Sequence, residues 1–246
     1  MEPIFRQRHK ISDMHLDCFG RVKPSVLLYF AQDAAGHHCN ELALDWDTLA
    51  KKHLFWAVTR HRVQISRLPR AGETITVETW PMPTTRVAFP RSTIGYDSSG
   101  QEVFRSISLW VLMDTQTRAM VLPGKSGVDV PGTLRGTELA APGSIFPKVL
   151  QNQVCRRVGY TELDRNGHMN NTRYMDWIDD LLPSAFHEAH PVKEFTICYL
   201  SEAKETQQIE LTWELTDGPC LQVNGHRQST SVPEKQERVF SAQIHF

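Results

Sequence analysis

The sequence predicts an α+β fold built from two copies of one unit, each a helix wrapped by an antiparallel sheet. Two internal shifts within the 246 residues support this prediction. Residues 17–21 (DCFGR) precede residues 164–168 (DRNGH) by 147 positions, and a run with helical apolar spacing follows both segments. Residues 61–80 match residues 195–214 at a shift of 134 positions, with the alternating apolar face of a strand kept in both. Two such units leave matching sheet edges, so we expect the two sheets to pair into one.

The first unit is predicted to be one helix followed by an antiparallel meander. A short extended stretch (5–11) leads to a helix that begins at about Pro24, because Pro suits a first turn. Asp45 can cap a short second helix that ends near residue 52. Alternating apolar residues predict strands at 54–66, 73–82, 86–96 and 102–113, with a turn at 97–100.

Residues 123–150 are expected to be a linker, because prolines and glycines interrupt every periodicity between residues 123 and 147. The expected units are therefore residues 1–122 and 151–246. The second unit repeats the order of the first, with Asp217-Gly218 as a hairpin turn. Its helix is predicted at 171–187, and its strands are predicted at 152–159, 193–201, 207–216, 221–228 and 237–246.

Composition excludes several functional classes. Lys plus Arg (27) nearly balances Asp plus Glu (28), which does not suggest a general nucleic-acid or anionic-membrane surface. No apolar run has the length of a signal peptide core or a membrane span, so we expect a cytoplasmic protein. The five cysteines form no Cys-x-x-Cys pair and are expected to be free thiols, with Cys155 and Cys220 buried. His37-His38-Cys39 is read as a polar helix end, because adjacent helical residues point about 100° apart and cannot easily share a metal.

The segment 162–171 (ELDRNGHMNN) places a carboxylate, amides and an imidazole in one turn ahead of the second helix. Taken alone, such a segment is an ordinary loop and helix N-cap. The duplication favours a different interpretation, because Phe19 and Arg21 stand where the second copy has Asn166 and His168. Asp and Gly recur and can serve the turn, whereas Asn166 and His168 belong to one copy. We therefore expect one active site per chain.

The segment 163–171, followed by Tyr174, together with residues 56–60 (WAVTR) and 108–114 (SLWVLMD), resembles the acyl-ACP thioesterases. These are the plant plastid enzymes and their bacterial relatives, and the resemblance covers residues 4–246. It implies a double hotdog fold and hydrolysis of the thioester between a fatty acyl chain and acyl carrier protein. Because no plastid transit peptide precedes Met1, the sequence is closer to what we expect of the bacterial branch.

The resemblance also implies the site residues. The catalytic Asp, Asn and His of the family fall on Asp164, Asn166 and His168, and a glutamate at the end of a later strand falls on Glu202. In the plant enzymes a cysteine follows that glutamate, but here the position is Ala203. A cysteine nucleophile is therefore not expected, and neither is a metal or a cofactor.

The first unit has Leu68 and Pro69 at the positions of Glu202 and Ala203, so its own site is expected to be vacant. Its helix is the more apolar of the two, and we expect this unit to supply the acyl-chain pocket.

These four residue types suit thioester hydrolysis. An imidazole, with an ordinary pKa of ~6.5, can accept or relay a proton near neutral pH. Glu202 could be the general base, or it could hold His168 or the water in place. Asn166 can donate to the carbonyl oxygen, and Asp164 can fix Asn166 or the nearby backbone. Backbone N–H groups after Asn170 are expected to add donors. The sequence leaves the division of labour open.

Two other functions remain compatible with the sequence: a non-catalytic acyl or carrier-protein binding module, and a hotdog dehydratase acting on 3-hydroxyacyl thioesters. The expected partner is acyl carrier protein carrying a fatty acyl chain, and a homodimer is compatible with the sequence. Four arginines could form a patch for the acidic carrier or simply a solvated face: Arg60, Arg62, Arg67 and Arg70.

Overall fold

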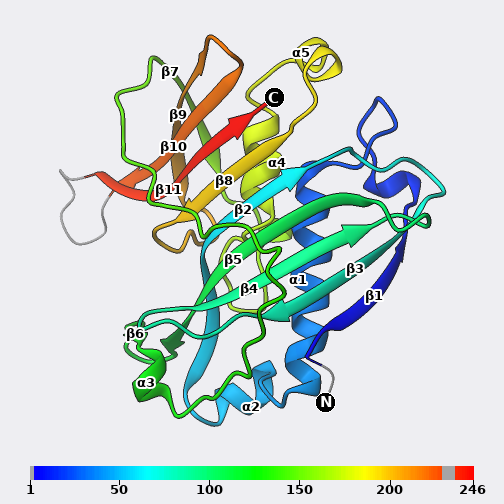
Figure 1. Ribbon diagram of the computed structural model, residues 1–246. Coiled ribbons are helices and arrows are strands. Elements are labelled where there is room, and N and C mark those ends of the chain that lie inside the picture. Colours follow the sequence, from blue (N-terminus) through cyan, green and yellow to red (C-terminus); the bar gives the residue numbers. More distant parts are fainter. Residues whose placement is uncertain (1–2, 229–235) are drawn as a thin grey trace. The chain divides into compact units, whose positions relative to one another are not determined.

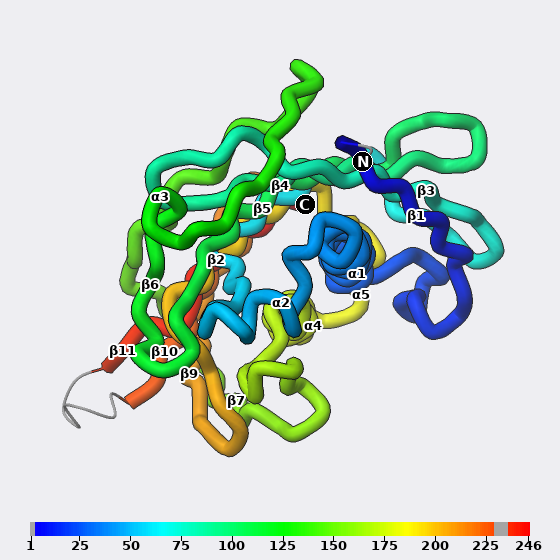
Figure 2. The backbone as a smooth tube through the Cα atoms, turned by 90° about the horizontal axis from the view of Figure 1, so that it is seen from below, coloured from blue at the N-terminus to red at the C-terminus, as the bar shows by residue number. Residues whose placement is uncertain are grey.

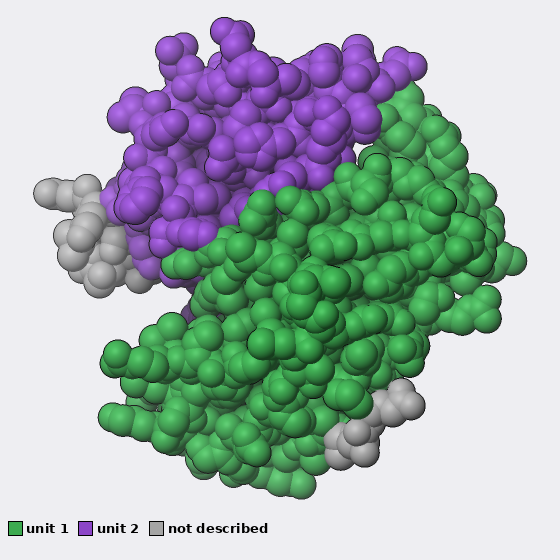
Figure 3. Space-filling view, in the orientation of Figure 1, with its two compact units in different colours: residues 1–142 green, residues 143–246 purple. Residues whose placement is uncertain are grey.

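The computed structural model describes residues 3–228 and 236–246. The chain divides into two compact units, Met1–Pro142 and Gly143–Phe246, which Figure 3 colours separately. Each unit is an antiparallel sheet with helices, as the sequence predicts. The α+β prediction is therefore confirmed.

Unit 1 contains a five-stranded antiparallel path in the order β1-β3-β4-β5-β2, with β6 paired to β5 (Figure 1). Its helices are α1 (Pro24–Glu41), α2 (Trp46–Ala50) and α3 (Pro123–Ser126). Its strands are β1 (Phe5–Lys10), β2 (Leu54–Ile65), β3 (Thr74–Pro81), β4 (Phe89–Tyr96), β5 (Glu102–Asp114) and β6 (Met120–Val121).

Helix α1 is the central helix of unit 1. Pro24 occupies its first turn, where the missing N–H costs no hydrogen bond. Leu27, Phe30 and Ala34 share its buried face, because residues three and four apart lie on one side of a helix. Figure 2 shows the sheet curving around α1. Ile75 on β3 is likewise fully buried, so the core of this unit lies between α1 and the sheet.

Unit 2 has the strand order β8-β11-β10-β9-β7, again antiparallel (Figure 1). Its helices are α4 (Arg173–Asp179) and α5 (Ser184–Ala189). Its strands are β7 (Asn152–Arg157), β8 (Glu194–Tyr199), β9 (Gln208–Thr216), β10 (Cys220–Gln228) and β11 (Gln236–His245).

The two units repeat each other in detail. Gly95 in β4 faces Phe104 of β5, and Gly225 in β10 faces Phe240 of β11. A Cβ added at either glycine would lie 2.2 Å from the phenylalanine ring, so both positions need the smallest residue. The strand register shifts directly after each glycine, at Gly95/Tyr96 and at Gly225/His226. The structure thus confirms the duplication beyond the segments that the sequence aligns.

Short 3-10 helices, which the apolar spacing does not predict, precede the polar turn in both units. They are η1 (Asp13–His15) and η2 (Tyr160–Glu162), 147 positions apart. The single helix predicted at 171–187 is wrong, because the chain forms α4 and α5 instead. Pro183, in extended conformation, stands at the N-cap of α5 and cannot continue a helix from α4.

The segment predicted as a linker contributes to unit 1 in its first part. Val128 and Val130 are buried in a cluster with Leu49, Leu54 and Leu112. The strand predicted from residue 86 begins at Phe89, since the preceding residues form a turn around the hydroxyl of Thr85.

Candidate active site

The polar turn of unit 2 is organised by Asp164. Its Oδ1 accepts the backbone N–H of Asn166 at 2.7 Å and that of His168 at 3.4 Å. The Asp164 N–H donates to the His168 carbonyl at 2.8 Å, which closes the turn. Gly167 has a φ of +74°, a region that glycine enters without steric cost. Asp and Gly thus build the turn, and they leave the side chains of Asn166 and His168 for other contacts.

His168 and Glu202 lie in direct contact, with 3.2 Å between Nε2 and Oε2. The sequence places them 34 positions apart (202 − 168), but the backbone brings them together. His168 pairs with Lys204 in an isolated bridge, and the Met169 N–H donates to the Ala203 carbonyl at 2.8 Å. The His168 side chain is 12% exposed and that of Glu202 is 34% exposed, so the pair is shielded yet reachable. A carboxylate that binds one imidazole nitrogen sets the position of the ring, as general acid–base chemistry requires.

Asn166 lies beside the carboxylate of Asp164. Its Nδ2 donates to Asp164 Oδ2 at 3.4 Å, so Asp164 orients the amide. An amide has two N–H donors. One can bind Asp164 while the other remains suited to a substrate carbonyl.

The equivalent turn in unit 1 has the same backbone with different chemistry. Asp17 Oδ1 accepts the N–H groups of Phe19 and Arg21, both at 2.9 Å, and Gly20 has a φ of +71°. The Val22 N–H donates to the Pro69 carbonyl at 2.8 Å, as Met169 does to Ala203. The Arg21 guanidinium then binds Asp17 Oδ2 at 3.0 Å and lies over the Phe19 ring. This copy holds an ion pair where unit 2 holds an imidazole and an amide.

The expected donors at the start of the helix after Asn170 are already engaged. Asn170 Oδ1 accepts the Thr172 N–H at 2.9 Å, and the Asn170 carbonyl accepts the Arg173 N–H at 3.0 Å. Helix α4 has only seven residues, which leaves a weak dipole. We therefore assign it no part in oxyanion binding.

Four residues outside the predicted site support it. Tyr174 is buried next to the site, and burial raises the pKa of its hydroxyl far above the usual value. Arg227, Ser201 and Glu237 surround the backbone of Glu202. Tyr174 follows the polar motif, but the other three lie on separate strand ends and meet only through the sheet register.

All five cysteines are free thiols. Cys198 and Cys220 are buried, whereas Cys155 is exposed, so the expectation that it would be buried is wrong. The reason is that β7 is an edge strand, which among the described strands pairs with β9 alone, and five of its six residues are exposed. Ala203 is fully buried, and its carbonyl serves the backbone pairing described above.

Among the arginines considered as a carrier patch, Arg67 is neutralised by carboxylates. Arg67 binds Glu73 at 2.7 Å and Asp97 at 2.7 Å, and Arg60 donates to the Pro142 carbonyl at 3.1 Å. These contacts favour the solvated-face interpretation for Arg67.

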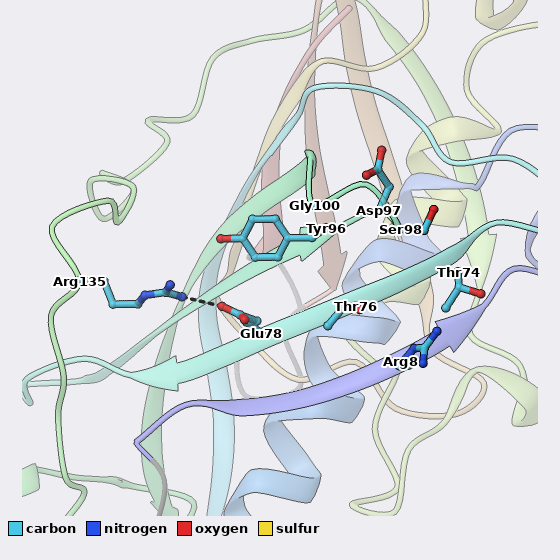
Figure 4. A pocket seen from close by; sticks show the side chains of 9 residues that line it. All are labelled: Arg8, Thr74, Thr76, Glu78, Tyr96, Asp97, Ser98, Gly100 and Arg135. Carbon is cyan, nitrogen blue, oxygen red and sulfur yellow. Dashed lines mark hydrogen bonds and ion pairs between the residues drawn. The ribbon is translucent and has the colours of Figure 1, made fainter.

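A pocket of about 460 Å³ lies in unit 1 along β1, β3 and the end of β4 (Figure 4). Both of its carboxylates are engaged: Glu78 binds Arg135 at 2.6 Å and Asp97 binds Arg67 at 2.7 Å. None of the four predicted site residues, Asp164, Asn166, His168 and Glu202, lines it.

Among the described residues, no three His, Cys, Asp or Glu side chains are placed to share a metal ion. The helices of residues 3–228 and 236–246 include none with the length and hydropathy needed to cross a membrane.

Two repeated units, each a helix with an antiparallel sheet, and one polar site in the second unit together define a double hotdog protein. The sequence comparison narrows this class. Residues 2–122 match the Acyl-ACP thioesterase N-terminal domain, and residues 150–242 match the Acyl-ACP thioesterase C-terminal domain. The chain belongs to the acyl-ACP thioesterase family, which confirms the resemblance drawn from the sequence.

Curated relatives include a dodecanoyl-[acyl-carrier-protein] hydrolase of Cinnamomum camphora, 28% identical over 219 residues, covering 81% of this chain and 56% of the relative. A palmitoyl-acyl carrier protein thioesterase of Gossypium hirsutum is 24% identical over 229 residues, covering 87% of this chain and 55% of the relative. Both are chloroplastic, and the chain spans just over half the length of each.

Solved structures agree on the fold. An acyl-ACP thioesterase from Bacteroides thetaiotaomicron superposes with a TM-score of 0.88 at 22% identity, covering 99% of this chain and 98% of the other. The 12:0-ACP thioesterase from Umbellularia californica gives a TM-score of 0.83 at 20% identity, covering 100% and 97%.

Proposed function

We propose that this protein hydrolyses the thioester of fatty acyl-acyl carrier protein and releases a free fatty acid. The observation that carries the proposal is the 3.2 Å contact between His168 and Glu202 on the Asp164 turn. Unit 1 keeps the same turn without those side chains, so the turn alone does not require them. Membership of the acyl-ACP thioesterase family supplies the substrate class.

In the proposed reaction, a water oxygen bonds to the thioester carbonyl carbon while the His168–Glu202 pair takes its proton. The amide of Asn166, oriented by Asp164, donates to the carbonyl oxygen as negative charge develops there. The carbon–sulfur bond then breaks, and the proton passes to the leaving sulfur. A thiol with an ordinary pKa of ~8.5 is a good leaving group, so the pair and the amide suffice to organise the reaction.

Acyl carrier protein is the proposed partner, and the cytoplasm is the proposed compartment. Five free thiols support a reducing environment, in which disulfides rarely persist.

The test follows free thiol during incubation of the full chain with long-chain acyl-ACP. Thiol release supports hydrolysis. Binding without thiol release would favour the non-catalytic module. Formation of an enoyl thioester from 3-hydroxyacyl-ACP, with the thioester intact, would favour the dehydratase.

A pair of variants assigns the site. We expect His168→Ala to lower the rate by about 10²-fold or more, the usual scale for a positioned acid or base. Arg21→Ala, the matched change in unit 1, should have a mild effect. Near wild-type turnover in the His168 variant would contradict the assignment.

A further inference from the structure

The segment that carries Glu202 has no regular secondary structure, yet its carboxylate must stay aimed at His168. The segment follows β8 directly, and Glu202 is the third residue after that strand (202 − 199). Loose strand ends move more than strand interiors, so an unsupported carboxylate here would sample many positions. Something has to fix the backbone of this segment.

Arg227, near the end of β10, contacts this segment at two points. Its Nη1 donates to the Glu202 carbonyl, and its Nη2 donates to Ser201 Oγ at 2.7 Å. Nη1 also reaches Gln207 Oε1 at 3.0 Å, which accepts the Lys204 N–H at 2.9 Å. One planar guanidinium therefore holds residues on both sides of Glu202, as a rigid fork of donors can and a lysine cannot.

Glu237, at the start of β11, fixes Arg227 in turn. Its Oε2 accepts from Arg227 Nε at 3.2 Å and from Nη2 at 3.1 Å, and its Oε1 accepts the Ser201 hydroxyl at 2.7 Å. The hydrogen bond from Ser201, together with the contact to Arg227, lowers the pKa of Glu237, so this carboxyl remains ionised. The Arg227 side chain is only 12% exposed, which weakens solvent screening of the pair.

At the equivalent place in unit 1 the arginine and the carboxylate stand at the ends of different strands than in unit 2. Arg67 stands at the position of Ser201, and Asp97 stands at the position of Arg227. There the guanidinium is held by the carboxylates of Asp97 and Glu73, and the segment after β2 carries Leu68 instead of a glutamate. In both units an ion pair lies beside the segment that follows the strand: Arg67–Asp97 in unit 1 and Arg227–Glu237 in unit 2. In unit 2 the guanidinium of Arg227 donates to the carbonyl of Glu202, the residue whose carboxylate contacts His168.

We propose that Arg227 is a positioning residue for the reaction: held by Glu237, it fixes the backbone of Glu202 and so keeps the carboxylate against His168. This inference rests on the proposed thioesterase function. Arg227 acts on the substrate only through Glu202, so its loss should affect turnover and not substrate binding.

The experiment compares Arg227→Lys and Arg227→Gln with Arg67→Lys, the matched variant in unit 1, in the full chain. With acyl-ACP as substrate, we expect both Arg227 variants to lose about 10-fold or more in kcat, with KM within about twofold. Their pH–rate profile should differ from that of the wild type, because a loosened Glu202 no longer holds the His168 ring at 3.2 Å. Arg67→Lys should keep the wild-type kcat and profile.

The outcomes separate the two proposals. If the wild-type chain releases no thiol, the proposed function fails. If the wild-type chain is active and the Arg227 variants keep its kcat and pH profile, the positioning role fails. A kcat that falls only in proportion to the folded fraction, with an unchanged profile, would also overturn it, because that result describes a purely structural arginine. A second variant, Glu237→Gln, removes the charge that holds Arg227, and a smaller loss of kcat in the same direction is expected.

Discussion

His61 lies in the middle of β2 and offers a quantitative test of the packing in unit 1. Its side chain is 3% exposed, and neither ring nitrogen has a hydrogen-bond partner among the described residues. Burial lowers the pKa of this imidazole from 6.5 to about 4, because the charged form loses its hydration. The folded protein therefore holds His61 neutral at a pH where the unfolded chain would protonate it.

The sign of the pH effect follows from this depression. The contribution of His61 to the pH dependence of the unfolding free energy is favourable above the unfolded pKa of 6.5. It is lost as the pH falls toward the folded pKa of about 4. At about 1.36 kcal/mol per unit of pKa, the full difference corresponds to about 3 kcal/mol, of which about 2 kcal/mol is lost between pH 7 and pH 5. A loss of about 2 kcal/mol is a large share of the stability of a typical domain.

The test is urea denaturation of the wild type and of His61→Leu at pH 7 and at pH 5. Leucine removes the titration and both unpartnered nitrogens, so the variant should lose about 2 kcal/mol less than the wild type between the two pH values. His245→Leu, an exposed imidazole on β11, controls for the loss of a histidine at the surface. Equal pH dependence in the wild type and in His61→Leu would refute the assignment of a neutral, buried ring.

Three further predictions follow from the structure. Iodoacetamide should label the exposed Cys18 and Cys155 and leave turnover almost intact, whereas an acyl-cysteine adduct trapped during turnover would overturn direct hydrolysis. Gly225→Ala should cost about 1–3 kcal/mol of unfolding free energy in urea, because its Cβ would overlap the facing phenylalanine; Gly124→Ala, with open space around it, is the control, and equal losses would contradict the packing argument. Given the proposed function, Ala34→Phe on the buried face of α1 should shorten the preferred acyl chain, and an unchanged profile across acyl-ACPs of graded length would count against an acyl pocket in unit 1.

Local chemistry made most strands and the polar turn predictable. Alternating apolar residues mark β3 and β9 without any tertiary information, and Asp164 with Gly167 identifies a turn by its own hydrogen bonds. The break between α4 and α5 was missed because the apolar spacing continues from Ile178 to Leu182, although Pro183 ends the helix. Periodicity describes a buried face and does not show where the backbone stops being helical.

Only some of the site residues could be predicted from the sequence, for a related reason. Glu202 was identified through the family resemblance, since nothing in its local sequence points to His168. Arg227 and Glu237 lack a motif, and their contacts depend on the register of β10 against β11, including the shift after Gly225. Such register is a property of the whole sheet and cannot be read from either strand alone.

The ion pair between Asp17 and Arg21 makes unit 1 an internal reference for the stability of the proposed site in unit 2. One chain contains the same turn twice, once with its aspartate neutralised by a neighbouring guanidinium and once with that partner replaced by a titratable ring. Active sites often carry groups that are poorly compensated in the folded state, and the comparison usually requires two proteins. Here the stability–activity trade-off can be measured between two halves of one molecule, with the backbone held constant.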